Sequence, residues 1–271
     1  IKNIRVEGNS FIVEKYGAST ALVITVNKEK GEINITNEKG TPLKYEIKEG
    51  LIEIKEKDFD KHIIEVIDDK KIVVKNEKGK ITLNITDKGI NYINNRGGRE
   101  ELNGIESIER VKFLDGKEEK GTGRVYIWSR TIPLLKNSLI IGSGPDTFSL
   151  KFPQNDRAGK FITWGDPNIV VDKPHNMYLQ IAVNTGVLSL IAFLLLIGYY
   201  VFESIKIYIK SDFSTYKSRV GLGVMLAVIG YCGAALFNDS LVSVAPVFWA
   251  LLGTGIGINR MNSSVNLLKN S

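Results

Sequence analysis

The feature that most constrains this chain is a run without a charged residue, from Tyr178 to Phe202. It contains 25 residues. At about 1.5 Å of rise per residue, a helix of that length would extend roughly 37 Å. Such a helix can cross a bilayer with some tilt, so we expect a transmembrane helix here.

Two further segments carry no charge, Val220 to Phe237 and Leu241 to Ile258. A Lys or Asp at the centre of a membrane helix would cost about 2.5 to 3.5 kcal/mol, so their absence predicts two more spans. Both segments are rich in glycine, which suits close contact between helices in lipid. Buried helices of a soluble protein are the alternative explanation.

The loops around these segments predict the orientation. The turn at 238–240 has no basic residue, whereas the loop between the first two predicted spans and the segment after the third contain Lys206, Lys210, Lys217, Arg219, Arg260 and Lys269. Positive charge favours the cytoplasmic side. The pattern therefore predicts a multi-pass protein of the cell membrane, with residues 1–177 extracytoplasmic, spans at about 178–202, 220–237 and 241–258, and a cytoplasmic tail at 259–271.

The first part of the chain, residues 1–118, predicts an antiparallel β domain. Its Ile, Val and Thr residues recur at every second position in short segments, which is typical of half-buried strands. The predicted strands are Ala21–Val26, Glu32–Thr36, Leu43–Lys48, Leu51–Lys55, His62–Ile67, Lys71–Lys75, Ile81–Thr86 and Ser107–Leu114. Glycine-containing turns at 37–40, 76–79 and 87–89 suit hairpins, so we expect a sandwich or barrel. The whole chain is thus predicted to be an α+β membrane protein.

Charge and cysteine content exclude some functions. The net charge of +6 suggests nucleic-acid binding, but the lysines alternate with glutamates rather than forming a basic stripe, so no nucleic-acid partner is expected. The single cysteine, Cys232, allows neither a disulfide framework nor a cysteine metal site. The chain begins Ile1-Lys2 without a signal sequence, which favours the C-terminal part of a longer membrane protein.

Two features of the β domain resemble metal-binding residues. Asp58-Phe59-Asp60 has the D-x-D form of metal-dependent glycosyltransferases, but a hard cation needs several converging oxygen atoms. His62 has no companion His or Cys nearby in the sequence. We interpret Asp58-Phe59-Asp60 as solvated surface and His62 as a structural strand residue, and we predict no metal site. We assign this domain to binding, spacing or regulation.

Residues 119–177 differ in pattern from the β domain. Thr122 can cap a helix that carries Arg124 and Trp128 one turn apart on one face, and Pro133 predicts a break in it. The following Gly142-Ser143-Gly144-Pro145 segment predicts a turn, with Pro145 at the first position of a short second helix. Residues 153–172 are rich in Pro, Asn, Asp and Gly and are predicted to be a loop.

These motifs, in this order, carry a resemblance. Gly123-Arg124-Val125-Tyr126-Ile127-Trp128, the turn from Ile140 to Phe148, and Pro174-His175-Asn176-Met177-Tyr178-Leu179-Gln180 with Gly186 resemble the O-antigen ligase and polymerase superfamily, often called the WaaL/Wzy family. Asn238-Asp239-Ser240 before Pro246-Val247-Phe248-Trp249 is similar to its later spans. The resemblance covers residues 121 to about 258, roughly half of the chain.

The resemblance implies an enzyme that moves a glycan from an undecaprenyl-diphosphate carrier to a glycan, lipid or cell-wall acceptor at the outer face, without metal, cofactor or nucleotide sugar. It also implies that Arg124 binds the carrier phosphate and that His175 is the catalytic histidine. The chain departs from the family pattern by its few spans and by the β insertion.

The chemistry of the residues is compatible with these roles. Arginine donates to two phosphate oxygens and stays charged, and histidine titrates near neutrality and can deprotonate a hydroxyl with inversion at the sugar. Further candidates for substrate contact are Trp128, Arg130, Arg157 and Asn176. Asn176 is also a candidate for orienting His175 or capping the helix. The alternative function is a non-catalytic membrane-tethered binding or sensing protein.

Overall fold

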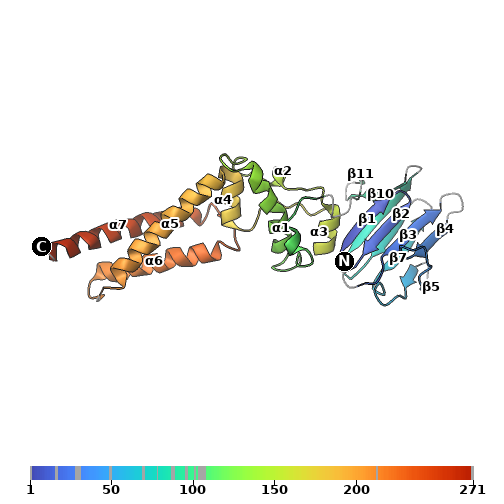
Figure 1. Ribbon diagram of the computed structural model, residues 1–271, viewed down its shortest axis with the longest axis horizontal. Helices are drawn as coiled ribbons and strands as arrows, with labels where there is room; N and C mark the ends of the chain where they lie inside the picture. The colour runs from blue at the N-terminus through green and yellow to red at the C-terminus, as the bar shows by residue number, and fades with distance from the viewer. Residues whose placement is uncertain are drawn as a thin grey trace. The chain divides into compact units, whose positions relative to one another are not determined.

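The computed structural model describes residues 2–15, 18–27, 32–48, 51–68, 71–77, 79–86, 89–94, 97–100, 102, 108–211 and 213–269. The chain divides into two compact units (Figure 1). The first contains residues 1–133 and 152–171, and the second contains residues 134–151 and 172–271.

Two antiparallel sheets form most of the first unit. The four-stranded sheet has the order β1-β2-β3-β4, with β1 at Asn3–Glu7, β2 at Ser10–Glu14, β3 at Leu22–Asn27 and β4 at Glu32–Thr36. The seven-stranded sheet has the order β11-β10-β9-β8-β7-β6-β5, with β5 at Tyr45–Lys48, β6 at Leu51–Ile54, β7 at Ile63–Asp68, β8 at Lys71–Lys75, β9 at Lys80–Thr86, β10 at Gly89–Ile93 and β11 at Arg99–Glu100. Each described neighbour pair is antiparallel, which confirms the predicted β domain.

The two sheets share one hydrophobic core. Phe11 and Leu22 of the smaller sheet belong to the same buried cluster as Ile64 and Leu83 of the larger one. Along β3, buried and half-buried residues alternate, as expected for a strand with one face on a core. Of the two predicted architectures, the described strands therefore fit the sandwich.

Most of the predicted strands are confirmed, and two kinds of error remain. The strands β1, β2, β10 and β11 were not predicted. The strand predicted at 107–114 is wrong, because residues 108–111 are irregular and Lys112–Leu114 form a 3-10 turn, η2; Ser107 lies outside the described residues. Lys78, Asp87 and Lys88 of the predicted turns also lie outside them.

His62 is buried beside the core of the β domain. Its side chain is 6% exposed, neither ring nitrogen has a partner among the described residues, and its ring meets Phe59 edge-on with centroids 5.8 Å apart. Burial lowers the pKa of His62 below its ordinary value of 6.5. The folded protein therefore binds a proton at this ring less readily than the unfolded chain does.

We expect the stability of the first unit to decrease as the pH falls below about 6.5, because the unfolded chain then binds a proton at His62 that the folded chain does not bind. Above that pH the ring is neutral in both states and contributes no pH dependence. Thermal unfolding of the wild type and of His62→Phe between about pH 7.5 and about pH 5 tests this. An equal decrease in both proteins would contradict the assignment.

The first unit also contains two α-helices. Helix α1 spans Arg124–Thr131 and passes at Ile132 into a 3-10 helix, η3, at Ile132–Asn137, which confirms the break predicted at Pro133. Thr122 does not cap α1, because the N-cap is Gly123 and no side chain caps it. The loop predicted at 153–172 is wrong in its middle, where α3 spans Arg157–Trp164.

The second unit is helical. Its helices are α2 at Phe148–Lys151, α4 at Met177–Thr185, α5 at Val187–Tyr208, α6 at Tyr216–Ala234 and α7 at Ala245–Lys269. Pro145 does not begin a helix, because α2 begins three residues later, at Phe148. Helix α7 continues through residues 259–269, which were predicted to be a tail.

The predicted span at 178–202 is not one helix. It is interrupted at Gly186, whose φ is 111°, and a Cβ atom there would lie 2.5 Å from the Ile140 carbonyl oxygen. Among the described residues one helix, α5, is long and apolar enough to cross a membrane. Helices α6 and α7 occupy the regions of the other two predicted spans, but polar and basic residues at their ends lower their hydropathy.

Helices α5, α6 and α7 pack against one another (Figure 1). Gly221 of α6 faces the Tyr208 hydroxyl and Gly255 of α7 faces the Tyr200 hydroxyl, and a Cβ at either glycine would collide with that hydroxyl. The close contact predicted from the glycines is thus present at these two positions. Gly223, Gly230, Gly233, Gly253 and Gly257 have open space instead.

Candidate functional site

His175 lies in the second unit, in the turn that leads into α4. Its φ is 48°, a left-handed conformation that is uncommon for residues with a side chain. Its Nδ1 lies 2.9 Å from Oδ2 of Asp239, which precedes α7. The side chain of His175 is 42% exposed and that of Asp239 is 5% exposed. A strained backbone thus holds an accessible imidazole against a buried carboxyl group.

This pairing determines which nitrogen of His175 can act as a base. An ionised carboxylate only accepts hydrogen bonds, so the shared hydrogen belongs to Nδ1 of the imidazole. The lone pair then remains on Nε2. Of the two carboxylate oxygens, only Oδ2 is used by His175, and Oδ1 of Asp239 is buried without a partner among the described residues. The arrangement suits proton abstraction by Nε2.

The start of α4 is fastened to the segment that carries Asp239. Five contacts do this: Asn176 Nδ2 donates to the Leu236 carbonyl at 2.9 Å, Met177 N to the Ala235 carbonyl at 2.9 Å, Tyr178 OH to the Cys232 carbonyl at 2.7 Å, Ser240 N to Gln180 Oε1 at 2.8 Å, and His175 joins Asp239. The residues of the P-H-N-M-Y-L-Q motif therefore mainly hold the start of α4 against residues 232–240, and this position brings His175 to Asp239.

Asn176 has the structural role that the sequence predicted for it. Its Oδ1 accepts from the Leu179 amide at 2.9 Å, which caps α4. Its side-chain nitrogen is bound to Leu236 at the same time. Asn176 therefore joins the backbone next to His175 both to the first turn of α4 and to Leu236.

Arg124 is the first residue of α1 in the first unit. Its Nη1 donates to the Gly121 carbonyl at 3.1 Å and to Thr122 Oγ1 at 2.8 Å, and the side chain is partly exposed. The preceding Gly123 has φ 86°, and a Cβ there would lie 2.3 Å from Trp164 Nε1. This close approach explains the glycine of the G-R motif, because it lets α1 begin directly against α3.

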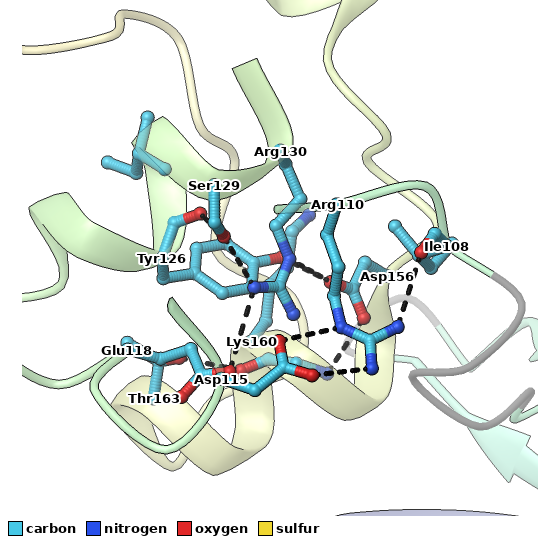
Figure 2. A network of polar contacts seen from close by, with 12 residues as sticks. Ile108, Arg110, Asp115, Glu118, Tyr126, Ser129, Arg130, Asp156, Lys160 and Thr163 are labelled. Carbon is cyan, nitrogen blue, oxygen red and sulfur yellow. Dashed lines mark hydrogen bonds and ion pairs between the residues drawn. The ribbon is translucent and has the colours of Figure 1, made fainter. Parts of the chain in front are cut away.

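Arg130 is fully buried rather than at a surface (Figure 2). Its Nε donates to Asp156 Oδ2 at 3.0 Å, Nη1 donates to Ser129 Oγ at 2.7 Å, and its guanidinium lies 4.2 Å from the centre of the Tyr126 ring. The Tyr126 hydroxyl also donates to Asp156, at 3.0 Å. Burial, and then the charge of Asp156, raise the pKa of Tyr126 well above its ordinary value. These side chains connect α1 to α3.

The remaining candidates lie in the same unit. Arg157, the first residue of α3, donates from Nη1 to the Pro167 carbonyl at 3.0 Å, and Trp128 is partly buried on α1. The structure thus groups Arg124, Trp128, Arg130 and Arg157 in the first unit, and His175 with Asn176 in the second. Contact of the first four with substrate stays a prediction.

One comparison with known proteins matches the part of the chain that contains Arg124 and His175. Residues 81–194 match the family model described as O-antigen ligase. This match supports membership of the chain in the O-antigen ligase and polymerase superfamily. Proteins of this family are membrane proteins that transfer glycans. In this chain, α5 is a candidate membrane span. Searches of curated proteins and of solved structures gave no match.

Asp239 is the residue of the candidate site that sequence reasoning missed. It lies outside the matched residues 81–194, and it was interpreted as part of a turn between spans and of a segment similar to the family's later spans, with no role in the site. The available signal was an acidic residue in a short loop between two apolar segments, where an unpaired charge is unfavourable. Among the described residues no three His, Cys, Asp or Glu side chains cluster as metal ligands.

We expect Asp239→Asn to slow glycan transfer by roughly 10- to 100-fold, because a hydrogen bond to a charged group contributes about 1.5 to 3 kcal/mol. An asparagine at this position can also donate to Nδ1 and stabilise the wrong tautomer of His175. The rate is measured with saturating lipid-linked donor. Asn238→Ala, at the exposed neighbouring residue, is the matched control, and an unchanged rate in Asp239→Asn would exclude the orienting role.

Proposed function

We propose that this protein transfers a glycan from an undecaprenyl-diphosphate-linked donor to an acceptor hydroxyl at the outer face of the cell membrane. The observation that carries the proposal is the His175–Asp239 pair, an accessible imidazole oriented by a buried carboxyl group. His175 falls within the residues that match the O-antigen ligase family. The reaction is that of a polysaccharide ligase or polymerase.

In the proposed reaction Nε2 of His175 removes the proton of the acceptor hydroxyl. The oxygen then attacks the anomeric carbon, the bond from that carbon to the diphosphate oxygen breaks, and the electron pair leaves with undecaprenyl diphosphate. Attack from the side opposite the leaving group inverts the anomeric centre. A diphosphate is already a good leaving group, so a single base suffices and a second carboxylic acid is not required.

Arg124 is the residue that we propose for the carrier phosphate. Its guanidinium is partly exposed and held at the start of α1 by Gly121 and Thr122. A planar guanidinium can bind two phosphate oxygens and neutralise the charge that develops on the leaving group. Trp128, one turn further along α1, and Arg157 are proposed as secondary contacts.

The proposal includes a membrane topology. Helices α5, α6 and α7 are proposed to span the membrane, with α5 the one that meets the length and hydropathy requirement by itself. Basic residues at the end of α5, between the two helices and at the start of α6 favour the cytoplasmic side for this connection; they are Lys206, Lys210, Lys217 and Arg219. The β-rich residues 1–118 and the segment 119–177 are then extracytoplasmic, where a lipid-linked diphosphate presents its sugar.

The test uses the full-length protein in proteoliposomes with a lipid-linked glycan donor and a glycan acceptor. We expect the release of undecaprenyl diphosphate together with a lengthened or newly linked glycan. Turnover should persist with EDTA and without nucleotide sugars. Binding of glycan without any turnover would reject the enzymatic proposal and favour the membrane-tethered binding protein.

A further inference from the structure

Three consecutive apolar side chains are exposed in the loop between η3 and α2. Leu139, Ile140 and Ile141 are 58%, 70% and 79% exposed. Leaving three such side chains in water is unfavourable, since burial of apolar surface stabilises by about 25 cal/mol per Å². Unlike a single exposed leucine, a contiguous apolar group indicates an interaction surface.

The loop is fixed to the junction of α4 and α5, within the same unit. Val187 N donates to the Ser138 carbonyl at 2.9 Å and Leu188 N to the Leu139 carbonyl at 3.1 Å. In the other direction, Ser143 N donates to the Val183 carbonyl at 2.8 Å and Gly144 N to the Asn184 carbonyl at 2.9 Å. The apolar side chains are therefore held beside the first turn of α5.

Two glycines make this attachment possible. A Cβ at Gly142 would lie 2.2 Å from the Asn184 carbonyl carbon, and one at Gly186 would lie 2.5 Å from the Ile140 carbonyl oxygen. Because both contacts are with backbone atoms, a larger residue at either position could not be accommodated by a side-chain rotation. The interruption between α4 and α5 thus provides the space in which the loop lies.

The exposed surface continues from the loop onto the candidate membrane helix. Leu188, Ile191 and Leu195 recur at helical spacing along the start of α5 and are 55%, 46% and 68% exposed. Leu188 is itself hydrogen-bonded to Leu139 through the backbone. The apolar loop and the apolar start of α5 therefore form one surface, which we call the loop–helix surface.

We propose that Leu139, Ile140 and Ile141 insert into the outer leaflet of the bilayer beside the N-terminal end of α5. A non-helical segment can enter this region only if its backbone polar groups are satisfied. The four backbone hydrogen bonds to the α4–α5 junction satisfy the carbonyls of Ser138 and Leu139 and the amides of Ser143 and Gly144. The proposal therefore places the three side chains in the leaflet and the backbone of Ile140 and Ile141 at its polar boundary. The inference rests on the membrane topology of the proposed function, in which α5 is a membrane helix, and not on the glycan-transfer reaction.

The test measures the depth of the loop in the membrane. Cys232, the single cysteine of the chain, is replaced by serine, and Ile140→Cys or Ile141→Cys is labelled with an environment-sensitive fluorophore in the full-length protein. The protein is reconstituted in phosphatidylcholine vesicles that contain nitroxide groups on the acyl chains. Leu194→Cys on α5 is the reference for a lipid-exposed site, and Glu38→Cys, at an exposed turn of the β domain, is the reference for water.

We expect the labels at 140 and 141 to emit at shorter wavelength than the label at 38, and acyl-chain nitroxides to quench them severalfold more strongly. Emission like that of the label at 38 would show a loop in water and overturn the proposal. Emission at short wavelength without quenching by the nitroxide lipids would show that protein covers the loop, which also overturns it. None of these outcomes depends on enzyme activity, so a failed transfer assay leaves the result intact.

Discussion

Replacing His175 with alanine is expected to abolish surface-polymer formation while the protein is still made and inserted. General-base assistance contributes about 10² to 10⁴ in rate, and no other imidazole is available, because the only other histidine, His62, is buried in the β domain. The measurement is polymer formation in cells that carry only the variant, together with the transfer rate in proteoliposomes. Normal polymer would contradict the proposed base.

The left-handed backbone at His175 calls for a second variant. With φ at 48°, alanine removes the imidazole and is also poorly suited to the turn, whereas asparagine tolerates this conformation. We expect His175→Asn to be as inactive as His175→Ala but better folded. Asp172→Asn, at an exposed residue three positions earlier, is the control and should retain activity. An active His175→Asn would show that the residue shapes the turn and does not act as a base.

The two halves of the His–Asp pair differ in how far the sequence could predict them. His175 was predicted because it lies in a local motif, P-H-N-M-Y-L-Q. Asp239 follows it by more than 60 residues, and the contact depends on the hydrogen bonds that fasten α4 to residues 232–240. Only the folded arrangement of α4 and α6 brings the carboxyl group to the imidazole.

In the β domain, the recurrence of Ile, Val and Thr predicted β3 to β9 within a few residues, although β5 is exposed along its whole length. It did not predict β2, where Phe11, Ile12 and Val13 are all buried, whereas β8, which has a similar run of three buried residues, was predicted. Strand β11 has two residues and leaves no pattern to detect.

Helix α3 was missed because its buried side chains are partly charged. Lys160 is 1% exposed and donates to the Gln154 carbonyl and side chain at 2.8 and 2.9 Å. A lysine, which sequence analysis assigns to the surface, is therefore part of the interior here. The available signals were Asp156 as an N-cap and Gly165 as a C-cap, with a segment of eight residues that contains apolar side chains between them. The predicted long span failed for a different reason, because it was inferred from the absence of charge alone and Gly186 interrupts the helix.

Removing the carboxyl group of Asp156 is expected to have the largest effect on stability. Its Oδ2 accepts from Arg130 and from the Tyr126 hydroxyl, and its Oδ1 caps α3 through the Gly159 amide at 2.8 Å. Asp156→Ala leaves the guanidinium of Arg130 buried without its closest counter-charge, since Glu118 lies 3.8 Å away. Breaking a buried ion pair in this way costs about 3 to 5 kcal/mol.

Hydrogen exchange of the α3 amides in the full-length protein measures this cost, because local opening reports the stability of the segment directly. We expect Asp156→Ala to lower their protection by roughly 10² to 10³-fold. Asp156→Asn keeps an acceptor for the helix cap, so it separates the effect of the lost charge from the effect of the lost cap.

Asp172→Ala, which removes an exposed carboxyl group, should change protection little. Equal protection in Asp156→Ala and Asp172→Ala would show that the Arg130–Asp156 pair does not hold α1 and α3 together. If the loss is as expected, Arg130 stabilises the helices around Arg124, and Arg124 remains the arginine proposed for the carrier phosphate.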